Sequence, residues 1–269
     1  MRLSMREYMA PGQTLQERVD NLDKLGYDGI ELVGANTEER IAEYRRVFAG
    51  SRVRPSIVSA SGGCLMDPRR EERQAAMDSI ALALDIAGEL GATGVIVVPL
   101  IAVTMQRDRP RIPDLSPLAG TKQLERDLLI EQLRILGGHA ARAGSFVILE
   151  PLNRYEQFWL NRLEEGVELC QAAGGDNLKI MADFFHMSIE EADIAASIRA
   201  ADGYIVNVHL ADSNRQTPGR GHTDFRPGLA ALKEMGYAHY MGLECGIPGD
   251  RMEELSRVAK HMRDLYASV

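Results

Sequence analysis

Short apolar runs alternate with longer segments of helical periodicity from one end of the chain to the other. Runs of about 4–8 apolar or alternating residues predict strands, and apolar residues three or four positions apart predict helices. The predicted strands are 3–9, 29–34, 53–59, 94–99, 146–151, 178–183, 204–210 and 240–245. The predicted helices are 14–25, 37–48, 68–90, 121–143, 161–173, 188–200, 227–235 and 250–267.

This alternation predicts an α/β fold with parallel strands, because each helix returns the chain to the same end of the sheet. Eight such units close into a single (β/α)8 TIM barrel, for which about 250 residues are typical. No linker divides the 269 residues, so we predict one catalytic barrel domain over 1–269. Two long loops, 99–120 and 211–227, follow strands and belong to the C-terminal face, where loops usually serve an active site.

Composition and charge narrow the class of protein. The formal net charge of −8 argues against nucleic acid as the main partner, since nucleic-acid-binding proteins usually carry a basic face. No apolar run approaches the roughly 20 residues that span a bilayer, and no apolar stretch follows the basic N-terminal residues. The three cysteines are far apart, which indicates buried thiols rather than disulfides. We therefore expect a cytoplasmic protein that engages no membrane.

Polar residues end four successive apolar strands. FVILE ends in Glu150, LKIMAD in Asp183, YIVNVH in His209 and YMGLE in Glu244. The C-terminal ends of parallel barrel strands meet at one mouth, so these side chains are expected to converge. The alternative for Asp183 alone is a strand-end residue that caps the next helix.

Three carboxylates and one imidazole are a ligand set for one divalent ion. Such mostly oxygen ligands favour Mn²⁺, with Mg²⁺ or Co²⁺ as alternatives, over a thiolate zinc site. Unpaired carboxylates so close together would repel one another, and a dication removes that conflict. His186 lies three residues after Asp183 and can face the same mouth.

The sequence resembles the xylose-isomerase-like sugar phosphate isomerase/epimerase superfamily, and within it the ketose 3-epimerases of the D-tagatose 3-epimerase type. The motifs that carry the resemblance are GYDGIEL (26–32), EPLNRYE (150–156), ADFFHMSIEE (182–191), HLADSNRQTPGRGHTDF (209–225) and GLEC (242–245). The family more often has Thr at Phe184 and Asn at Ser188. The segment 107–120 matches no family motif and could reshape the pocket.

The resemblance implies a role for each matching position. It implies metal ligation by Glu150, Asp183, His209 and Glu244, acid/base catalysis by Glu150 and Glu244, and binding of substrate oxygens by Glu156, His186 and Arg215. The implied partner is a small sugar, and the resemblance also allows a homo-oligomer.

These roles fit the inversion of C3 in a ketose or keto-sugar acid. Removing the proton beside the ketone gives an enediolate, which a metal can stabilise as a Lewis acid. Inversion then requires acid/base groups on both faces of the carbon, and two glutamates on different strands can supply them. His186 and Arg215 offer directed donors for substrate oxygens.

Several of these residues could instead have purely structural roles. Arg215 could be a solvated loop residue, Glu156 could pair with Arg154 or Arg162, and His186 could cap a helix. His222 and Asp224 could contribute to a second metal site, although one ion already satisfies the four ligands.

Other functions remain open alongside the epimerase. The same superfamily contains aldose–ketose and hydroxypyruvate-type isomerases and inosose-type dehydratases. A phosphodiesterase like the apurinic-site endonucleases expects more strand-end histidines and a basic groove. A barrel that only binds a metabolite is a further alternative, which an intact set of four ligands disfavours.

Overall fold

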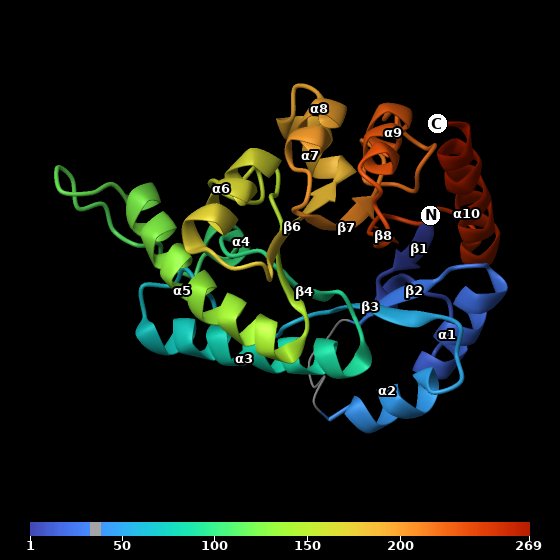
Figure 1. Ribbon diagram of the computed structural model, residues 1–269, viewed down its shortest axis with the longest axis horizontal. Coiled ribbons are helices and arrows are strands. Elements are labelled where there is room, and N and C mark those ends of the chain that lie inside the picture. The colour runs from blue at the N-terminus through green and yellow to red at the C-terminus, as the bar shows by residue number, and fades with distance from the viewer. Residues whose placement is uncertain (33–38) are drawn as a thin grey trace.

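Eight parallel strands form a nearly closed barrel, as predicted (Figure 1). The computed structural model describes residues 1–32 and 39–269. The sheet order is β1-β8-β7-β6-β5-β4-β3-β2, and an isolated parallel bridge between Arg6 and Glu31 links the two outer strands. The strands are β1 (Arg2–Met5), β2 (Gly29–Leu32), β3 (Arg54–Val58), β4 (Gly94–Val97), β5 (Phe146–Leu149), β6 (Leu178–Asp183), β7 (Ile205–Leu210) and β8 (Tyr240–Leu243).

Helices cover the outside of the barrel (Figure 1). They are η1 (Glu7–Met9), α1 (Leu15–Lys24), α2 (Ile41–Phe48), α3 (Arg70–Leu90), α4 (Ile101–Met105), α5 (Thr121–Ala143), α6 (Leu163–Ala173), α7 (Phe184–Glu190), α8 (Ile194–Ala200), α9 (Arg226–Glu234) and α10 (Arg251–Ser268). The main hydrophobic core lies between the strands and these helices. None of the helices in the described part of the chain is long and apolar enough to cross a membrane.

Two predicted elements differ from those observed. The first strand stops at Met5, because the chain turns into the 3-10 helix η1 where a strand was expected to continue to residue 9. Helix 188–200 is two helices, and the first of them begins directly after β6 because the Asp183 carboxylate caps it. In the strand predicted over 29–34 and the helix predicted over 37–48, positions 33–34 and 37–38 lie outside the described residues.

The loop 99–120 contains α4 and then projects from the body of the molecule ahead of α5 (Figure 1). Two arginines fix it. Arg109 pairs with Asp67 and Glu72, and Arg111 donates to both carboxylate oxygens of the buried Glu125, at 2.8 and 3.1 Å.

A small second apolar cluster contains Ile148 and Met181. Ile148 lies two positions before Glu150, which directly follows β5, and Met181 lies two positions before Asp183 on β6. Residues two apart point to the same side of a strand. The cluster therefore forms an apolar floor beneath the polar residues at the C-terminal strand ends.

Candidate metal centre and active site

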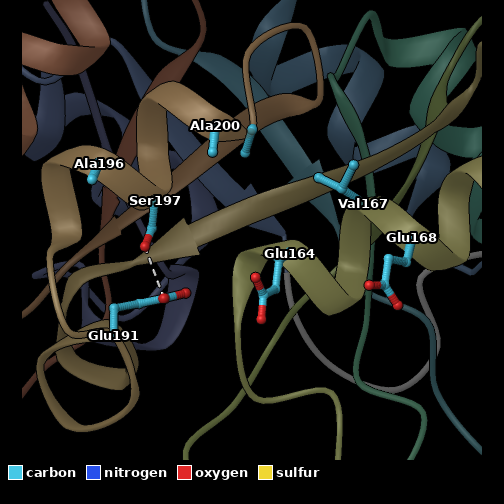
Figure 2. A pocket seen from close by; sticks show the side chains of 8 residues that line it. Glu164, Val167, Glu168, Glu191, Ala196, Ser197 and Ala200 are labelled. Atoms are coloured by element: carbon cyan, nitrogen blue, oxygen red, sulfur yellow. Dashed lines mark hydrogen bonds between the residues drawn. The ribbon is translucent and has the colours of Figure 1, made fainter.

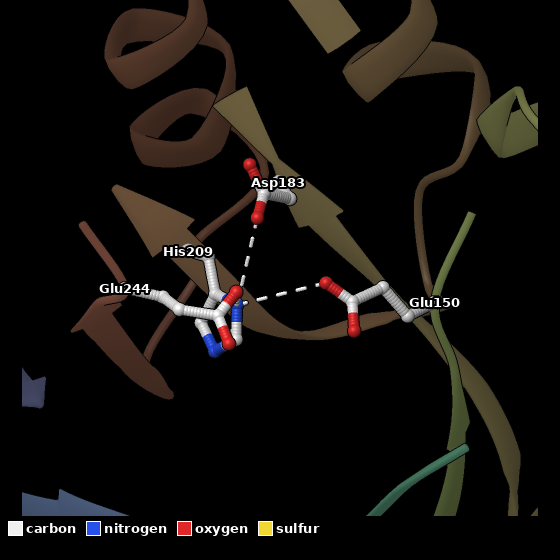
Figure 3. Close-up of side chains that lie close together, drawn as sticks. All are labelled: Glu150, Asp183, His209 and Glu244. Atoms are coloured by element: carbon white, nitrogen blue, oxygen red, sulfur yellow. Dashed lines mark ion pairs between the residues drawn. The ribbon is translucent and has the colours of Figure 1, made fainter. Parts of the chain in front are cut away.

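The structure brings Glu150, Asp183, His209 and Glu244 together at the C-terminal ends of β5 to β8 (Figure 3). One ligand atom from each residue lies within 4.8 Å of the others. His209 Nδ1 is at the centre, 3.6 Å from Glu150 Oε1, 3.6 Å from Asp183 Oδ2 and 3.3 Å from Glu244 Oε2. This convergence is the one expected of parallel barrel strands.

Three of these atoms are buried and lack a hydrogen-bond partner among the described residues. They are Glu150 Oε1, Asp183 Oδ2 and His209 Nδ1. Buried polar atoms almost always have a hydrogen-bond partner. Three atoms without one that face each other are therefore suited to binding a shared ligand. A divalent cation fits, because carboxylate oxygens and an imidazole nitrogen are its usual ligands. These four residues could therefore hold a metal ion.

Asp183 divides its two oxygens between structure and the site. Oδ1 accepts from the backbone N–H groups of Phe185, at 2.7 Å, and His186, at 3.2 Å, and so caps α7. Oδ2 makes no such bond within the described residues and faces His209. The capping alternative and the ligand hypothesis for Asp183 are thus compatible, since each uses a different oxygen.

The electrostatics of the group follow from burial and close opposite charges. Burial disfavours a charged His209, but the carboxylates of Glu31 and Glu244 outweigh it and raise the His209 pKa well above its usual value. Burial likewise opposes ionisation of Asp183, yet His186 and His209 lower its pKa. A cation at the centre is therefore strongly favoured, whether it is a proton on the ring or a metal ion.

Glu244 lies between two arginines. Arg6 Nε is 3.0 Å from Oε1 and Arg215 Nη2 is 2.7 Å from Oε2. Burial would raise the Glu244 pKa, but His209 and these guanidinium groups lower it far below its usual range. Glu150 has no arginine partner in the described part of the chain. The two glutamates consequently have different surroundings.

Arg215 links Glu244 to His186. Arg215 Nη1 is 3.0 Å from His186 Nε2, and the Arg215 guanidinium stacks 4.5 Å from the Phe185 ring centroid. The Arg215 backbone has a φ of 56°, a left-handed conformation that is strained for a residue other than glycine. The Arg215 side chain is therefore fixed by its contacts at the site. The alternative of a solvated loop residue does not hold.

Asn153 connects Glu156 to His186. The Asn153 backbone N–H donates to His186 Nδ1 at 3.1 Å, and its side-chain Nδ2 donates to Glu156 Oε1 at 2.9 Å. Arg154 forms an ion pair with Glu190, and Arg162 forms one with Glu164. Neither arginine is therefore the surface partner of Glu156 that the structural alternative expected. The structure thus places all three predicted substrate-binding residues near one another.

His222 and Asp224 are exposed, and Asp224 pairs with Arg226 at 3.5 Å. They do not join the four-residue group, and the described residues contain a single such group. A second metal site at these residues finds no support in this arrangement.

Three contributors were missed by sequence reasoning. Arg6, which directly follows β1, and Glu31 on β2 contact the group. Asp212 organises the loop that carries Arg215, by accepting backbone N–H groups of Ser213, Gly219 and Thr223. Glu31 carried a weaker signal than the four ligands, because the sequence places it inside a predicted apolar strand and not at the end of one.

A cavity of about 390 Å³ lies on the outside of the barrel between α6 and α8 (Figure 2). It is lined in part by Glu164, Glu168 and Glu191. Glu191 accepts a hydrogen bond from Ser197 at 2.8 Å. None of the strand-end residues contributes to it, so it is separate from the candidate metal centre.

A model of the family described as xylose isomerase-like TIM barrel matches residues 19–265. The chain belongs to this family. The superfamily resemblance and the barrel fold predicted from the sequence are therefore confirmed.

Several curated relatives of this xylose isomerase-like barrel are named as epimerases, and one is named as a 2-oxo-tetronate isomerase. The 3-dehydro-D-guloside 4-epimerase of Escherichia coli is 28% identical over 86% of this chain and 87% of its own length. The L-ribulose 3-epimerase of Mesorhizobium japonicum is 38% identical, but over 48% of this chain and 43% of its own length. Similarity therefore extends along most of the chain in the first case and under half of it in the second.

Solved structures of epimerases have the same fold as this chain. The crystal structure of 3-keto-D-glucoside 4-epimerase from E. coli has a TM-score of 0.89 and 25% identity, and the match covers 98% of this chain and 99% of that one. A D-psicose 3-epimerase from Clostridium cellulolyticum, solved with D-tagatose, has a TM-score of 0.82 at 22% identity over 100% of this chain and 99% of that one. The second likeness concerns the fold alone.

Proposed function

We propose that this chain is a divalent-metal-dependent carbohydrate epimerase that inverts a carbon next to the ketone of a keto-sugar. The observation that carries the proposal is the convergence of Glu150 and Glu244, from β5 and β8, on the same buried group with orphaned ligand atoms. The curated names of the relatives support the same class of reaction.

Glu150, Asp183, His209 and Glu244 would hold the ion, for which Mn²⁺ is our first choice. When bound, the ion supplies a Lewis acid for negative charge that develops on the oxygens beside the reacting carbon.

We place the protein in the cytoplasm, where its three free cysteines are stable as thiols.

Glu150 and Glu244 would act as the acid/base pair. One glutamate takes the proton from the carbon beside the ketone, and the other returns a proton to the opposite face. Their unequal surroundings suit this division, because Arg6 and Arg215 favour the carboxylate form of Glu244. Either can start the reaction, depending on which epimer is bound.

His186 and Arg215 would donate hydrogen bonds to the oxygen that becomes negatively charged. The Asn153 N–H occupies His186 Nδ1, so in the neutral ring Nε2 carries the hydrogen. Nε2–H and the Arg215 guanidinium then present two donors side by side, an arrangement that an acceptor oxygen of the substrate satisfies. Glu156 would accept from a substrate hydroxyl.

Two substrate types follow from the relatives. The family resemblance favours C3 of a ketose or keto-sugar acid, and the relative that matches along most of its length is named as a 4-epimerase of a 3-dehydro-guloside. Both reactions invert a carbon adjacent to a ketone, so the same pair of glutamates serves either substrate.

The test is incubation of Mn²⁺-loaded protein with a panel of ketoses, keto-sugar acids and 3-keto-glucosides, followed by separation of the products. We expect one epimer pair to interconvert, and Glu244→Gln and Glu150→Gln to lose this activity while remaining folded. Formation of an aldose would move the assignment to an isomerase. No reaction on any member of the panel would refute the proposal.

A further inference from the structure

Glu31 is a buried carboxylate that the proposed reaction does not use. It lies on β2, its side chain has no solvent exposure, and the bridge between its backbone and that of Arg6 joins β1 to β2. A buried charge is costly unless it is paired and hydrogen-bonded. Such a residue in the barrel interior therefore calls for a specific partner.

The partner is His209. Its Nε2 lies 3.1 Å from Glu31 Oε1 and 3.2 Å from Oε2, so the ring edge faces both oxygens. The other ring nitrogen, Nδ1, faces Glu150, Asp183 and Glu244. A carboxylate only accepts hydrogen bonds, so Nε2 must carry a hydrogen. In the neutral ring the lone pair is then on Nδ1, which points into the ligand group.

Two further contacts keep Glu31 in this position. Arg6 Nη1 lies 3.3 Å from Glu31 Oε2. Gly242 on β8 leaves the space that the carboxylate occupies, since a Cβ there would lie 2.4 Å from Glu31 Oε1. Arg6, just after β1, together with residues of β7 and β8 thus holds the Glu31 carboxylate behind the imidazole.

We propose that Glu31 is a positioning residue of the metal centre, which fixes His209 as the Nε2–H tautomer and aims Nδ1 at the ion. The inference rests on the proposed function and adds a specific determinant of metal affinity to it. Carboxylates behind metal-binding histidines orient the ring and raise its basicity, and their loss typically weakens metal binding about 10- to 100-fold.

The first test is Mn²⁺ titration of metal-free protein, read by electron paramagnetic resonance of free Mn²⁺. Glu31→Met removes the acceptor, and we expect the Mn²⁺ dissociation constant to rise about 10- to 100-fold. Glu31→Gln keeps one acceptor oxygen and should show a smaller rise. The matched control is Glu125→Gln, which changes another fully buried carboxylate, paired with Arg111 and Trp159, and should leave the constant unchanged.

The second test needs no variant. In Mg²⁺-loaded protein labelled with ¹⁵N-histidine, the two-bond proton–nitrogen pattern of His209 should show the hydrogen on Nε2. A hydrogen on Nδ1 would overturn the inference, and so would unchanged Mn²⁺ affinity in both Glu31 variants. Failure of the wild-type protein to bind any divalent ion would instead overturn the proposed function, and this inference with it.

Discussion

Replacing Asp212 by Asn should destabilise the loop that carries Arg215. The Asp212 carboxylate accepts backbone N–H groups of Ser213 and Gly219, each at 2.8 Å, and of Thr223 at 3.0 Å. An asparagine amide has one acceptor oxygen, and its NH₂ group would face N–H donors that it cannot satisfy. The change therefore leaves partly buried backbone donors without a partner, which is costly.

The magnitude follows from the pKa of Asp212. Burial would raise this pKa, but the backbone N–H groups lower it from 3.8 to about 2. At about 1.4 kcal/mol per pH unit, the interaction stabilises the folded protein by roughly 2 kcal/mol. For a chain of this size, that loss lowers the melting temperature by about 4–8 °C. Because the folded-state pKa is depressed, the contribution is present above pH 3.8 and is lost as pH falls toward 2.

Urea and thermal unfolding of wild type and Asp212→Asn measure this difference. The control is Asp224→Asn, an exposed carboxylate of the same loop, which should change stability by less than about 0.5 kcal/mol. The difference in free energy of unfolding between wild type and Asp212→Asn should become smaller as the pH is lowered from about 5 to about 3. Equal stability at pH 7, or a gap that widens on acidification, would refute the reasoning. We also expect a higher KM, because Arg215 loses its fixed position.

Three further predictions concern the metal centre and the barrel interior. Mn²⁺ at about 100 times its dissociation constant should stabilise the protein by about 2.7 kcal/mol in thermal unfolding, and EDTA should reverse the gain. Because carboxylates raise the His209 pKa, ion binding should displace a proton, so Mn²⁺ affinity should fall as the pH is lowered. Calorimetry in two buffers of different ionisation enthalpy detects that proton, and identical heats would contradict the prediction. Gly242→Ala should cost about 1–3 kcal/mol in thermal unfolding, since its Cβ would overlap Glu31, whereas Gly50→Ala, with no atom within 4 Å of its Cβ, should be tolerated.

The barrel and the four-residue group could be predicted because both rest on local patterns. An apolar strand that ends in a carboxylate or imidazole is visible in the sequence, and parallel topology brings such ends together. Glu150, Asp183, His209 and Glu244 all follow this pattern, and the structure places them within one small volume.

Glu31 and Arg6 could not be assigned in the same way. The predicted strand over 29–34 placed Glu31 in a strand interior, and the strand predicted over 3–9 did the same for Arg6. Their contacts join β1 and β2 to β7 and β8, which are distant in sequence and meet only when the barrel closes. Pairings of this kind depend on tertiary geometry, which local periodicity does not encode.

Asp212 illustrates a different limit. Its role depends on a loop that wraps around one carboxylate, with Gly219 at a φ of 88° and Gly221 so close that a Cβ would lie 2.3 Å from Asp212 Oδ1. The glycines indicated a shaped loop, but the residue at its centre could not be identified before the backbone path was known.

Solvent exchange during the reaction tests the central claim most directly. Mn²⁺-loaded protein would be incubated in D₂O with the sugar that it epimerises, and proton NMR would follow each carbon beside the ketone. The proposed pair of glutamates predicts one deuterium at the inverted carbon of each product molecule, with little label in unreacted substrate at early times. Inversion without solvent deuterium at that carbon, or deuterium at C1 with formation of an aldose, would contradict the account.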